Sequence, residues 1–372
     1  MEACPVKIQR LERVKRGRLI AISDIHGHAG WLRRLLEEVR PTHRDEVFIV
    51  GDLIERGSEN LEALRLVMAL WRQGAHVCRG NWDLHVLRLV EDERAAAEML
   101  REGRSFVRRF GNSLLDDFMR GVGVGADWPA QRAQRAVQEA YAPELEFLRG
   151  LPDIIETPHR IFVHGGLPHE RLSELEGCPA AAFLKNDCFL EQGISFKKFL
   201  MVGHTPARSY TEGVICHAPH IHRGQRIASI DGGCGVLPEG QLNAVISPGE
   251  ASEEFSWISA DDFPLIRALD DQQASQHALT VHWPHNRVEV LSREAEGLWL
   301  KHPFSGRTLF ARENELYHQA DGAHLMDKTD YCLPVQAGER LKLIRLEQNG
   351  RALVKGRGVV GWYLGRYERI ES

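Results

Sequence analysis

The chain contains 372 residues, of which 43% are hydrophobic and 27% are charged, and it carries a formal net charge of −5 with a pI near 6.4. This composition excludes a mostly disordered, collagen-like or coiled-coil protein. The slightly negative net charge gives no indication of non-specific nucleic-acid binding. At roughly 150 residues per domain, the length predicts two or three domains.

Two further features bear on the compartment. The sequence has no apolar run of about 18 residues, the length that a membrane-spanning helix needs, and its N-terminus lacks the apolar stretch of a signal peptide. Its seven cysteines are dispersed and form no Cys-x-x-Cys pair, which is typical of reduced thiols. We therefore expect a cytoplasmic protein with no membrane partner.

From Arg18 to Pro248, short apolar runs alternate with longer segments of helical period, the pattern of strands joined through helices. The expected strands are 18–23, 46–50, 76–78, 160–163, 200–202, 227–230 and 242–246. The segment 84–151 is expected to be a helix-rich cover beside the sheet. This part of the chain therefore predicts an α/β domain over residues 1–250.

The composition becomes more polar after Pro248, which predicts a linker over 251–276. Beyond it the chain repeats itself, because Arg287–Leu291 recurs as Arg340–Ile344 at an offset of 53 residues. Two small all-β barrels, 277–322 and 323–372, are expected, and they resemble tandem SH3-like domains. Three aromatic residues there suit either a peptide-binding groove or core packing: Trp299, Trp362 and Tyr363.

Five short polar motifs each follow an apolar run. They are Asp24-Ile25-His26-Gly27-His28, Gly51–Gly57, Gly80-Asn81-Trp82-Asp83, His164-Gly165-Gly166 and Gly203-His204-Thr205. Each would lie at the carboxyl end of a strand, where α/β folds place their ligand crevice. One such motif is more often a cap or a packed turn. Five in this order, with carboxylate, imidazole and amide groups, predict a metal site.

Over residues 18–248 these motifs resemble the calcineurin-like metallophosphoesterases, specifically the phosphoprotein phosphatase branch that also contains diadenosine tetraphosphate hydrolases. The branch pattern Gly-Asp-x-x-Asp-Arg-Gly is met by Gly51–Gly57, with Glu55 in place of the second aspartate. The closing pattern Ile-Asp-Thr-Gly-Cys is met by Ile230–Cys234, with Gly232 in place of the threonine. The resemblance implies a β-sandwich flanked by helices.

The resemblance also implies a dinuclear metal centre in which Asp52 bridges two ions. The implied ligands are Asp24, His26 and Asp52 for one ion, and Asp52, Asn81, His164 and His204 for the other. Two divalent transition metal ions are the expected cofactors, manganese or iron first, with zinc as the alternative. They would share a hydroxide that attacks phosphorus in line, while Arg56 stabilises the equatorial oxygens.

Trp82 is the main departure from the family pattern, because it stands where the family has the histidine that acts as general acid. A positioned general acid contributes about 10²- to 10⁴-fold in rate, so activity is expected to persist on substrates with good leaving groups. Glu55 is interpreted as an accommodation to Trp82. With Arg56 and Asp83, these two residues complete the expected catalytic set.

Other residues offer alternatives. His85 and His28 could supply a different acid, although packed or solvated histidines are the commoner case. His217, His220 and His222 predict a surface loop rather than a zinc site, because no cysteine spacing accompanies them. The stretch 184–187 aligns with the family's Trp-x-Arg-Asp but lacks the arginine, and Lys185 offers only a point charge there.

The sequence therefore predicts a dinuclear metal-dependent phosphoesterase whose first expected substrate is phosphorylated serine or threonine in a protein. A dinucleoside polyphosphate hydrolase is one alternative, since Asn81–His85 resembles the Asn-His-Asp-Leu-His run of diadenosine tetraphosphatases except at Trp82. A metal-binding pseudophosphatase that serves as an interaction module is another. The expected partners are a phosphorylated protein or nucleotide, and a peptide or protein at the C-terminal barrels.

Overall fold

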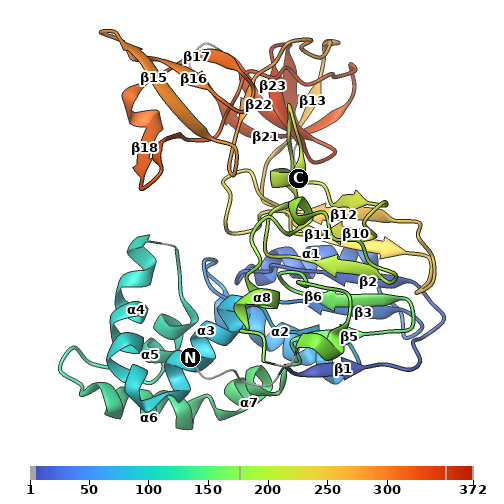
Figure 1. The fold of residues 1–372 in the computed structure, drawn as a ribbon, viewed down its shortest axis with the longest axis vertical. Coiled ribbons are helices and arrows are strands. Elements are labelled where there is room, and N and C mark those ends of the chain that lie inside the picture. The colour runs from blue at the N-terminus through green and yellow to red at the C-terminus, as the bar shows by residue number, and fades with distance from the viewer. Residues whose placement is uncertain (1–5, 110, 176, 348–349, 371–372) are drawn as a thin grey trace. The chain divides into compact units, whose positions relative to one another are not determined.

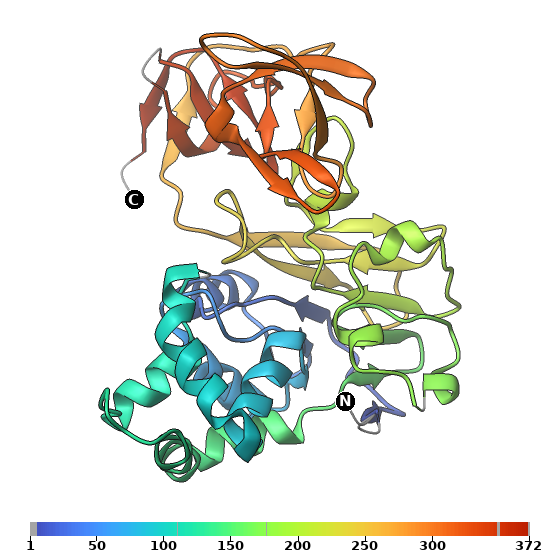
Figure 2. The same ribbon diagram turned by 60° about the vertical axis from the view of Figure 1, so that its left-hand side comes forward.

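The computed structural model describes residues 6–109, 111–175, 177–347 and 350–370. The chain divides into two compact units, one formed by 1–207 with 218–262 and the other by 208–217 with 263–372 (Figures 1 and 2). Among the described residues, no helix combines the length and the apolar character that crossing a membrane requires.

Two sheets form the centre of the first unit, in the strand orders β1-β5-β6-β7-β10-β9 and β12-β11-β2-β3-β4. The strands of the first sheet are β1 (Ile8–Arg10), β5 (Ile154–Glu156), β6 (Arg160–Val163), β7 (Phe199–Val202), β10 (Ile227–Ser229) and β9 (His220–His222). Those of the second are β12 (Ser256–Ala260), β11 (Leu242–Ser247), β2 (Leu19–Ile22), β3 (Glu46–Val50) and β4 (His76–Cys78). Strands β2, β3 and β4 run parallel, as do β6 and β7.

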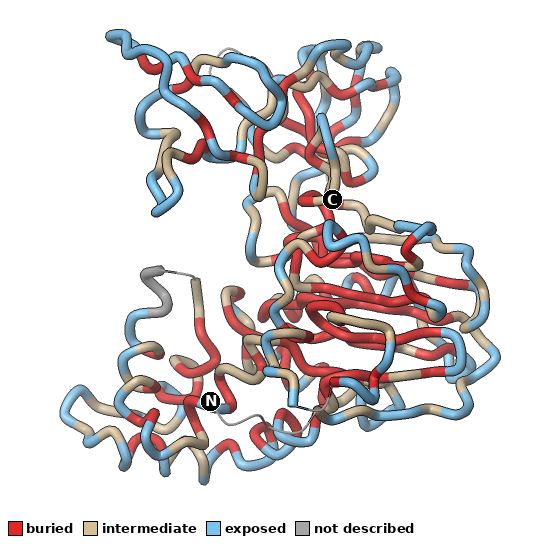
Figure 3. Tube along the Cα trace, viewed as in Figure 1, coloured by how far each residue is buried: buried red, intermediate tan, exposed pale blue. Residues whose placement is uncertain are grey.

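The two sheets pack face to face. Phe48 on β3 stacks on Phe162 on β6 with the ring centroids 3.8 Å apart. Along β2, Leu19 and Ala21 point into this inter-sheet core, whereas the intervening Ile20 joins the core under the helices. Both faces of β2 are therefore buried, which explains why its sequence is a continuous run of apolar residues. Figure 3 shows these buried strands as red bands. The expected sandwich is confirmed.

Helices cover the outer face of the β2-containing sheet and form a separate bundle beside it (Figure 1). They are α1 (Ala29–Val39), α2 (Asn60–Arg72), α3 (Asn81–Glu91), α4 (Ala96–Arg109), α5 (Leu114–Gly121), α6 (Ala130–Ala140), α7 (Ala142–Gly150) and the short α8 (Ala181–Leu184). Single 3₁₀ turns are η1 (Glu93–Ala95), η2 (Leu172–Leu175), η3 (Phe189–Gln192), η4 (Ala207–Tyr210) and η5 (Glu313–Glu315). The helix-rich segment expected over 84–151 corresponds to α3–α7.

The C-terminal unit is rich in antiparallel strands. One sheet has the order β24-β13-β21-β22-β23-β8, a second has β17-β16-β15-β19-β18, and β14 pairs with β20. The strands are β8 (Ile215–Cys216), β13 (Leu265–Ala268), β14 (Thr280–Val281), β15 (Arg287–Arg293), β16 (Leu298–His302), β17 (Arg307–Ala311), β18 (Leu316–Gln319), β19 (Gly322–Leu325), β20 (Lys328–Thr329), β21 (Arg340–Leu346), β22 (Ala352–Gly356), β23 (Val359–Tyr363) and β24 (Tyr367–Arg369).

The repeat at an offset of 53 residues is present in this unit. Strands β15-β16-β17 and β21-β22-β23 form equivalent antiparallel meanders, and the first pair of each has a register shift at the same place, between Val290 and Ser292 and between Leu343 and Arg345. Each meander has its own core. Whether the meanders are SH3-like stays a prediction.

The boundaries differ from the expected linker and barrels. The segment 251–276 contains β12, which pairs with β11 in the first unit, and β13, which pairs with β21 in the second. The polar residues that suggested a linker lie around these short strands. Among the aromatic residues, Trp362 and Tyr363 are buried, whereas Trp299 is 41% exposed.

Candidate metal centre

Six polar side chains lie just beyond the carboxyl ends of five strands. In chain order they are Asp24 and His26 after β2, Asp52 after β3, Asn81 after β4, His164 after β6 and His204 after β7. The two packed sheets therefore both contribute, at edges where parallel strands end together. The structure brings together all six residues that the sequence predicted as ligands.

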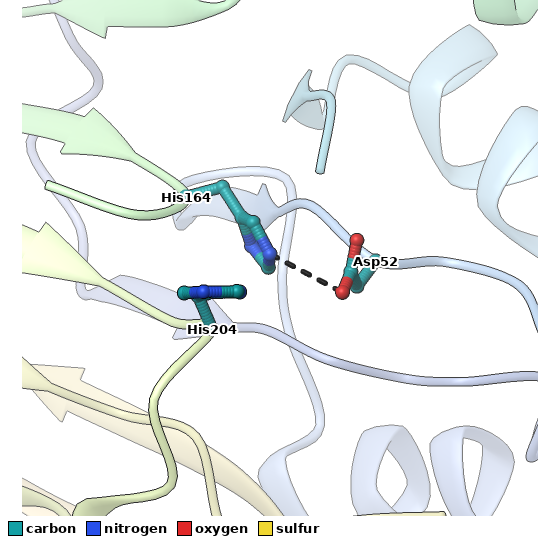
Figure 4. Close-up of side chains that lie close together, drawn as sticks. All are labelled: Asp52, His164 and His204. Atoms are coloured by element: carbon teal, nitrogen blue, oxygen red, sulfur yellow. Dashed lines mark ion pairs between the residues drawn. The ribbon is translucent and has the colours of Figure 1, made fainter. Parts of the chain in front are cut away.

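Asp52 lies at the centre of this arrangement. Its Oδ2 lies 3.2 Å from His164 Nε2 and 3.7 Å from His26 Nε2. Two groups of ligand atoms converge within 4.8 Å, Asp24 with His26 and Asp52, and Asp52 with His164 and His204. Figure 4 shows the imidazole of His164 directed at Asp52, with the His204 ring beside it. A carboxylate common to both groups is the arrangement that a bridging ligand needs.

Each of the three histidines places one ring nitrogen against an oxygen acceptor. His26 Nδ1 lies 3.2 Å from Ile54 O, His164 Nδ1 lies 3.0 Å from Val50 O, and His204 Nε2 lies 2.8 Å from Asp187 Oδ1. These acceptors fix an N–H on that side of each ring, so the other nitrogen is directed into the site. Metal-binding histidines are typically oriented in this way.

Asn81 completes the second group. Its amide oxygen lies 3.2 Å from His164 Nε2 and 2.9 Å from His204 Nδ1. In this orientation an oxygen and two imidazole nitrogens face one another, an arrangement that a bound cation would satisfy. In the reversed orientation, which suits a site without an ion, the amide donates to both rings and to Leu184 O, and its oxygen accepts from Trp82 N. This donor set of nitrogen and oxygen atoms fits a divalent transition metal.

The backbone at these ligands is strained. Asp24, His26, Asp52 and His204 all have positive φ, of 54°, 46°, 49° and 67°. Non-glycine residues adopt this region rarely, and such strain gathers at functional sites where the surroundings hold it. Glycines permit the close packing, since a Cβ on Gly203 would lie 2.2 Å from Asp24 Oδ2.

The electrostatics of the site favour a bound cation. Burial raises the pKa of Asp24 to about 7 and lowers the pKa of His26 to about 4. Burial would also lower the pKa of His164, but the nearby Asp52 and Asp24 carboxylates outweigh it and raise that pKa to about 10. This favours the protonated form of His164, whose Nε2–H donates a hydrogen bond to Asp52 at 3.2 Å. A divalent ion held here would take the place of that proton and offset the charge of the clustered carboxylates.

Trp82 lies in the first turn of α3, and its backbone N–H donates to Asp52 Oδ1 at 2.9 Å. Its indole lies against the Arg56 guanidinium, with the carbon Cζ 5.3 Å from the ring centroid, and against the edge of His85 at 5.7 Å. The indole of Trp82 therefore lies beside the candidate ligands, and its N–H can donate a hydrogen bond but is far too weakly acidic to serve as a general acid. His85 is held by Glu102, at 2.7 Å.

Glu55 and Asp83 are placed as supports of the surrounding chain. Glu55 is buried and accepts from Ser113 Oγ at 3.2 Å and Leu114 N at 3.0 Å, at the start of α5. Burial raises its pKa to about 8. Asp83 is also buried and accepts from Gly80 N at 2.7 Å and Leu53 N at 3.0 Å, which joins the Asn81 turn to the Asp52 loop.

Sequence reasoning assigned no role to two further carboxylates. Asp187 orients His204 through the contact with Nε2 described above. The only signal for this role in the sequence is that Asp187 ends the stretch 184–187, which aligns with a family motif. Asp231, in the closing motif, is buried, and its Oδ2 has no hydrogen-bond partner within the described part of the chain. Burial raises its pKa well above the ordinary value.

The histidine cluster is not the expected surface loop. His220 and His222 are in β9 of the first unit, whereas His217 is fully buried and belongs to the C-terminal unit. The apolar Ile221 between the two strand histidines packs onto the core, which explains why this polar stretch forms a strand.

Residues 17–229, more than half of the chain, match the family profile described as calcineurin-like phosphoesterase. The chain belongs to the calcineurin-like phosphoesterase family. Curated relatives include the symmetrical bis(5'-nucleosyl)-tetraphosphatases of Mannheimia succiniciproducens, 33% identical over 32% of this chain and 48% of that protein, and of Thioalkalivibrio sulfidiphilus, 46% identical over 18% and 26%. The chain spans about half, or less, of the length of these two relatives.

Solved structures with a similar fold include a protein serine/threonine phosphatase from Saccharomyces cerevisiae, 10% identical with a TM-score of 0.41 over 69% of this chain and 84% of that one. A metallophosphoesterase from Sphaerobacter thermophilus is 18% identical, with a TM-score of 0.36 over 66% and 89%.

Proposed function

We propose that this chain is a dinuclear metal-dependent phosphohydrolase that cleaves phosphoanhydrides, with a dinucleoside polyphosphate as its substrate class. The observation that carries the proposal is the convergence of Asp24, His26 and Asp52 with Asn81, His164 and His204 around a shared carboxylate, beside a position where Trp82 replaces the acid.

The leaving group decides between substrates. A phosphate leaving group departs from an anhydride as a stabilised anion, whereas serine or threonine departs as an alkoxide that requires a proton in the transition state. Trp82 cannot supply that proton. The names of the curated relatives point the same way. Phosphorylated serine or threonine, the first expectation from the sequence, is therefore the second candidate.

The residues divide the work as follows. When bound, two divalent ions supply charge that activates water and polarises the phosphoryl group. Asp24, His26 and Asp52 would hold one, and Asp52 with Asn81, His164 and His204 the other. Arg56 binds the phosphoryl oxygens through its guanidinium, whose planar donors suit a phosphate.

A substrate panel tests the proposal. With manganese-loaded protein, we expect hydrolysis of diadenosine tetraphosphate and of p-nitrophenyl phosphate, and hydrolysis of a phosphoserine peptide slower by about the 10²- to 10⁴-fold that a general acid contributes. Equal rates on the peptide and the anhydride would contradict the substrate class. Protein that binds two ions yet hydrolyses nothing would be a pseudophosphatase.

A further inference from the structure

The second turn of α3 carries a histidine beside the candidate metal centre. His85 is four residues after Asn81 and three after Trp82, so it lies next to both on the helix surface. Side chains in an α-helix lean toward its N-terminus, which here is the end that holds Asn81. His85 is therefore directed back toward the candidate ligands rather than away from them.

Arg56, Trp82 and His85 form a continuous row beside these ligands. Arg56 Cζ lies 5.3 Å from the centroid of the Trp82 indole, and the His85 ring meets that indole edge-on, with the two centroids 5.7 Å apart and the planes at 84°. The backbone N–H of Trp82 donates to Asp52 Oδ1 at 2.9 Å. The row therefore begins at a candidate ligand and places a guanidinium and an imidazole against one indole.

The next helix holds His85 in a fixed orientation. Its Nε2 lies 2.7 Å from Glu102 Oε2 on α4. The carboxylate can only accept, so Nε2 carries the proton of this contact. Within the described part of the chain, Nδ1 has no hydrogen-bond partner, and the side chain is 31% exposed. One ring nitrogen is thus committed, while the other is free to meet a ligand.

A second ion pair joins the same two helices further from the centre. Arg88 Nη2 lies 3.6 Å from Glu98 Oε2, and Arg88 is two helical turns past Asn81. Partly exposed pairs of this kind contribute little to folding, because water screens them. The Arg88–Glu98 pair therefore shows what a contact between α3 and α4 does when it lies away from the site.

The charges at His85 suit an anionic ligand. A doubly protonated imidazole donates from both ring nitrogens. With the Nε2–H directed at Glu102, the Nδ1–H is left for an anionic oxygen, and the charge of the carboxylate is offset. The two ions and Arg56 would hold the reacting phosphoryl group. A donor one helical turn beyond Asn81 is placed for a phosphate further along the chain.

We propose that His85, oriented by Glu102, binds the phosphates of the substrate that lie beyond the reacting one, and so selects a polyphosphate chain over a simple monoester. The inference rests on the proposed hydrolysis of phosphoanhydrides. It gives His85 a role in substrate specificity, in place of the role as an acid that the sequence suggested as an alternative.

Steady-state kinetics of the manganese-loaded, full-length protein tests this on diadenosine tetraphosphate, which has a chain of phosphates, and on p-nitrophenyl phosphate, which has one. His85→Gln removes the group at the Nδ1 position, and His85→Ala removes the ring at a helical position that alanine favours. His85→Asn keeps an amide donor near Nδ1. Arg88→Gln is the matched control, because it breaks the neighbouring pair between the same helices. Thermal unfolding reports the fold of each variant.

We expect His85→Gln and His85→Ala to raise KM for diadenosine tetraphosphate at least about tenfold, the lower end of what a hydrogen bond to a charged group contributes. Their kcat should change less, and their KM for p-nitrophenyl phosphate should stay near the wild-type value. His85→Asn should lie between these variants and the wild type, and Arg88→Gln should match the wild type on both substrates. Should one of the first two variants fail to fold, the other decides.

A KM for diadenosine tetraphosphate that stays unchanged in these variants, or a KM that rises equally on both substrates, would overturn the inference and leave the proposed function intact. An equal rise in Arg88→Gln would also overturn it, because the pairing of the helices would then be responsible. Wild-type protein that hydrolyses no anhydride would reject the proposed function and this inference with it.

Discussion

The guanidinium of Arg56 and the indole of Trp82 form a cation–π pair, with Cζ of Arg56 5.3 Å from the ring centroid, beside the candidate metal ligands. In the function that we propose, Trp82 would stand in place of a proton donor and offer an aromatic surface to the arginine that binds phosphate. The contact would then link the missing acid to the preference for anhydrides.

Loss of the aromatic ring at position 82 should weaken substrate binding. A cation–π contact contributes about 0.5–2 kcal/mol, so we expect Trp82→Leu to raise KM for p-nitrophenyl phosphate by about twofold to thirtyfold, with a smaller change in kcat. Trp82→Phe keeps an aromatic face and should lie close to the wild type. Steady-state kinetics measures both, and equal effects of Leu and Phe would show that the ring does not support Arg56.

A histidine at position 82 should restore part of the acid's work. We expect Trp82→His to raise the rate on an alkyl phosphomonoester at least about tenfold while p-nitrophenyl phosphate changes little, because only the alkoxide needs a proton. The gain in rate should stay below the full effect of a general acid, about 10²- to 10⁴-fold. The reason is that the Glu55 carboxylate already accepts hydrogen bonds from Ser113 and Leu114 and is not available to orient the new imidazole. An equal gain on both esters would count against this account.

Glu55 should make stability depend on pH. Its folded-state pKa of about 8 lies above the ordinary 4.5, so the folded protein retains a proton that the unfolded chain loses between these values. The free energy of unfolding therefore falls as pH rises through this window. Glu55→Gln removes that loss, and we expect its melting temperature to exceed the wild type's by more at pH 8 than at pH 5. A constant difference across pH would contradict the burial of a protonated Glu55.

Gly203 should be required for the metal site because of the space it leaves. A Cβ there would lie 2.2 Å from Asp24 Oδ2, so Gly203→Ala must displace a ligand. We expect reduced metal content after manganese loading. Gly249→Ala is the control, since its Cβ would meet nothing within 4 Å. Normal metal content in Gly203→Ala would mean that Asp24 is not a ligand.

Much of the first unit could be predicted from local sequence. The expected strands 46–50, 76–78 and 160–163 match β3, β4 and β6, because strands buried on both faces are continuous apolar runs that end at glycine and polar residues. The polar motifs at these strand ends contain the six ligand candidates, which the resemblance to the family then singled out. Short strands such as β1 and β9 were missed, since three residues, two of them polar, give no clear period.

The rest depends on pairings across long stretches of chain. Cys216 pairs with Val359, and His204 is oriented by Asp187 from a loop without regular period. The hydrogen bonds of Glu55 with Ser113 and Leu114 likewise join a strand loop to a helix start far along the chain. Local spacing cannot predict such contacts, which is why Glu55 was assigned to Trp82 and residues 208–217 to the first unit.

The most direct test of the central claim is the metal content of purified, manganese-loaded protein measured by elemental analysis. We predict about two ions per chain, and a sharp reduction in Asp52→Asn, because Asp52 belongs to both ligand groups. Asp262→Asn, at a 70%-exposed carboxylate paired with Arg34, should retain both ions. Fewer than about half an ion per chain in the wild type would contradict the dinuclear site.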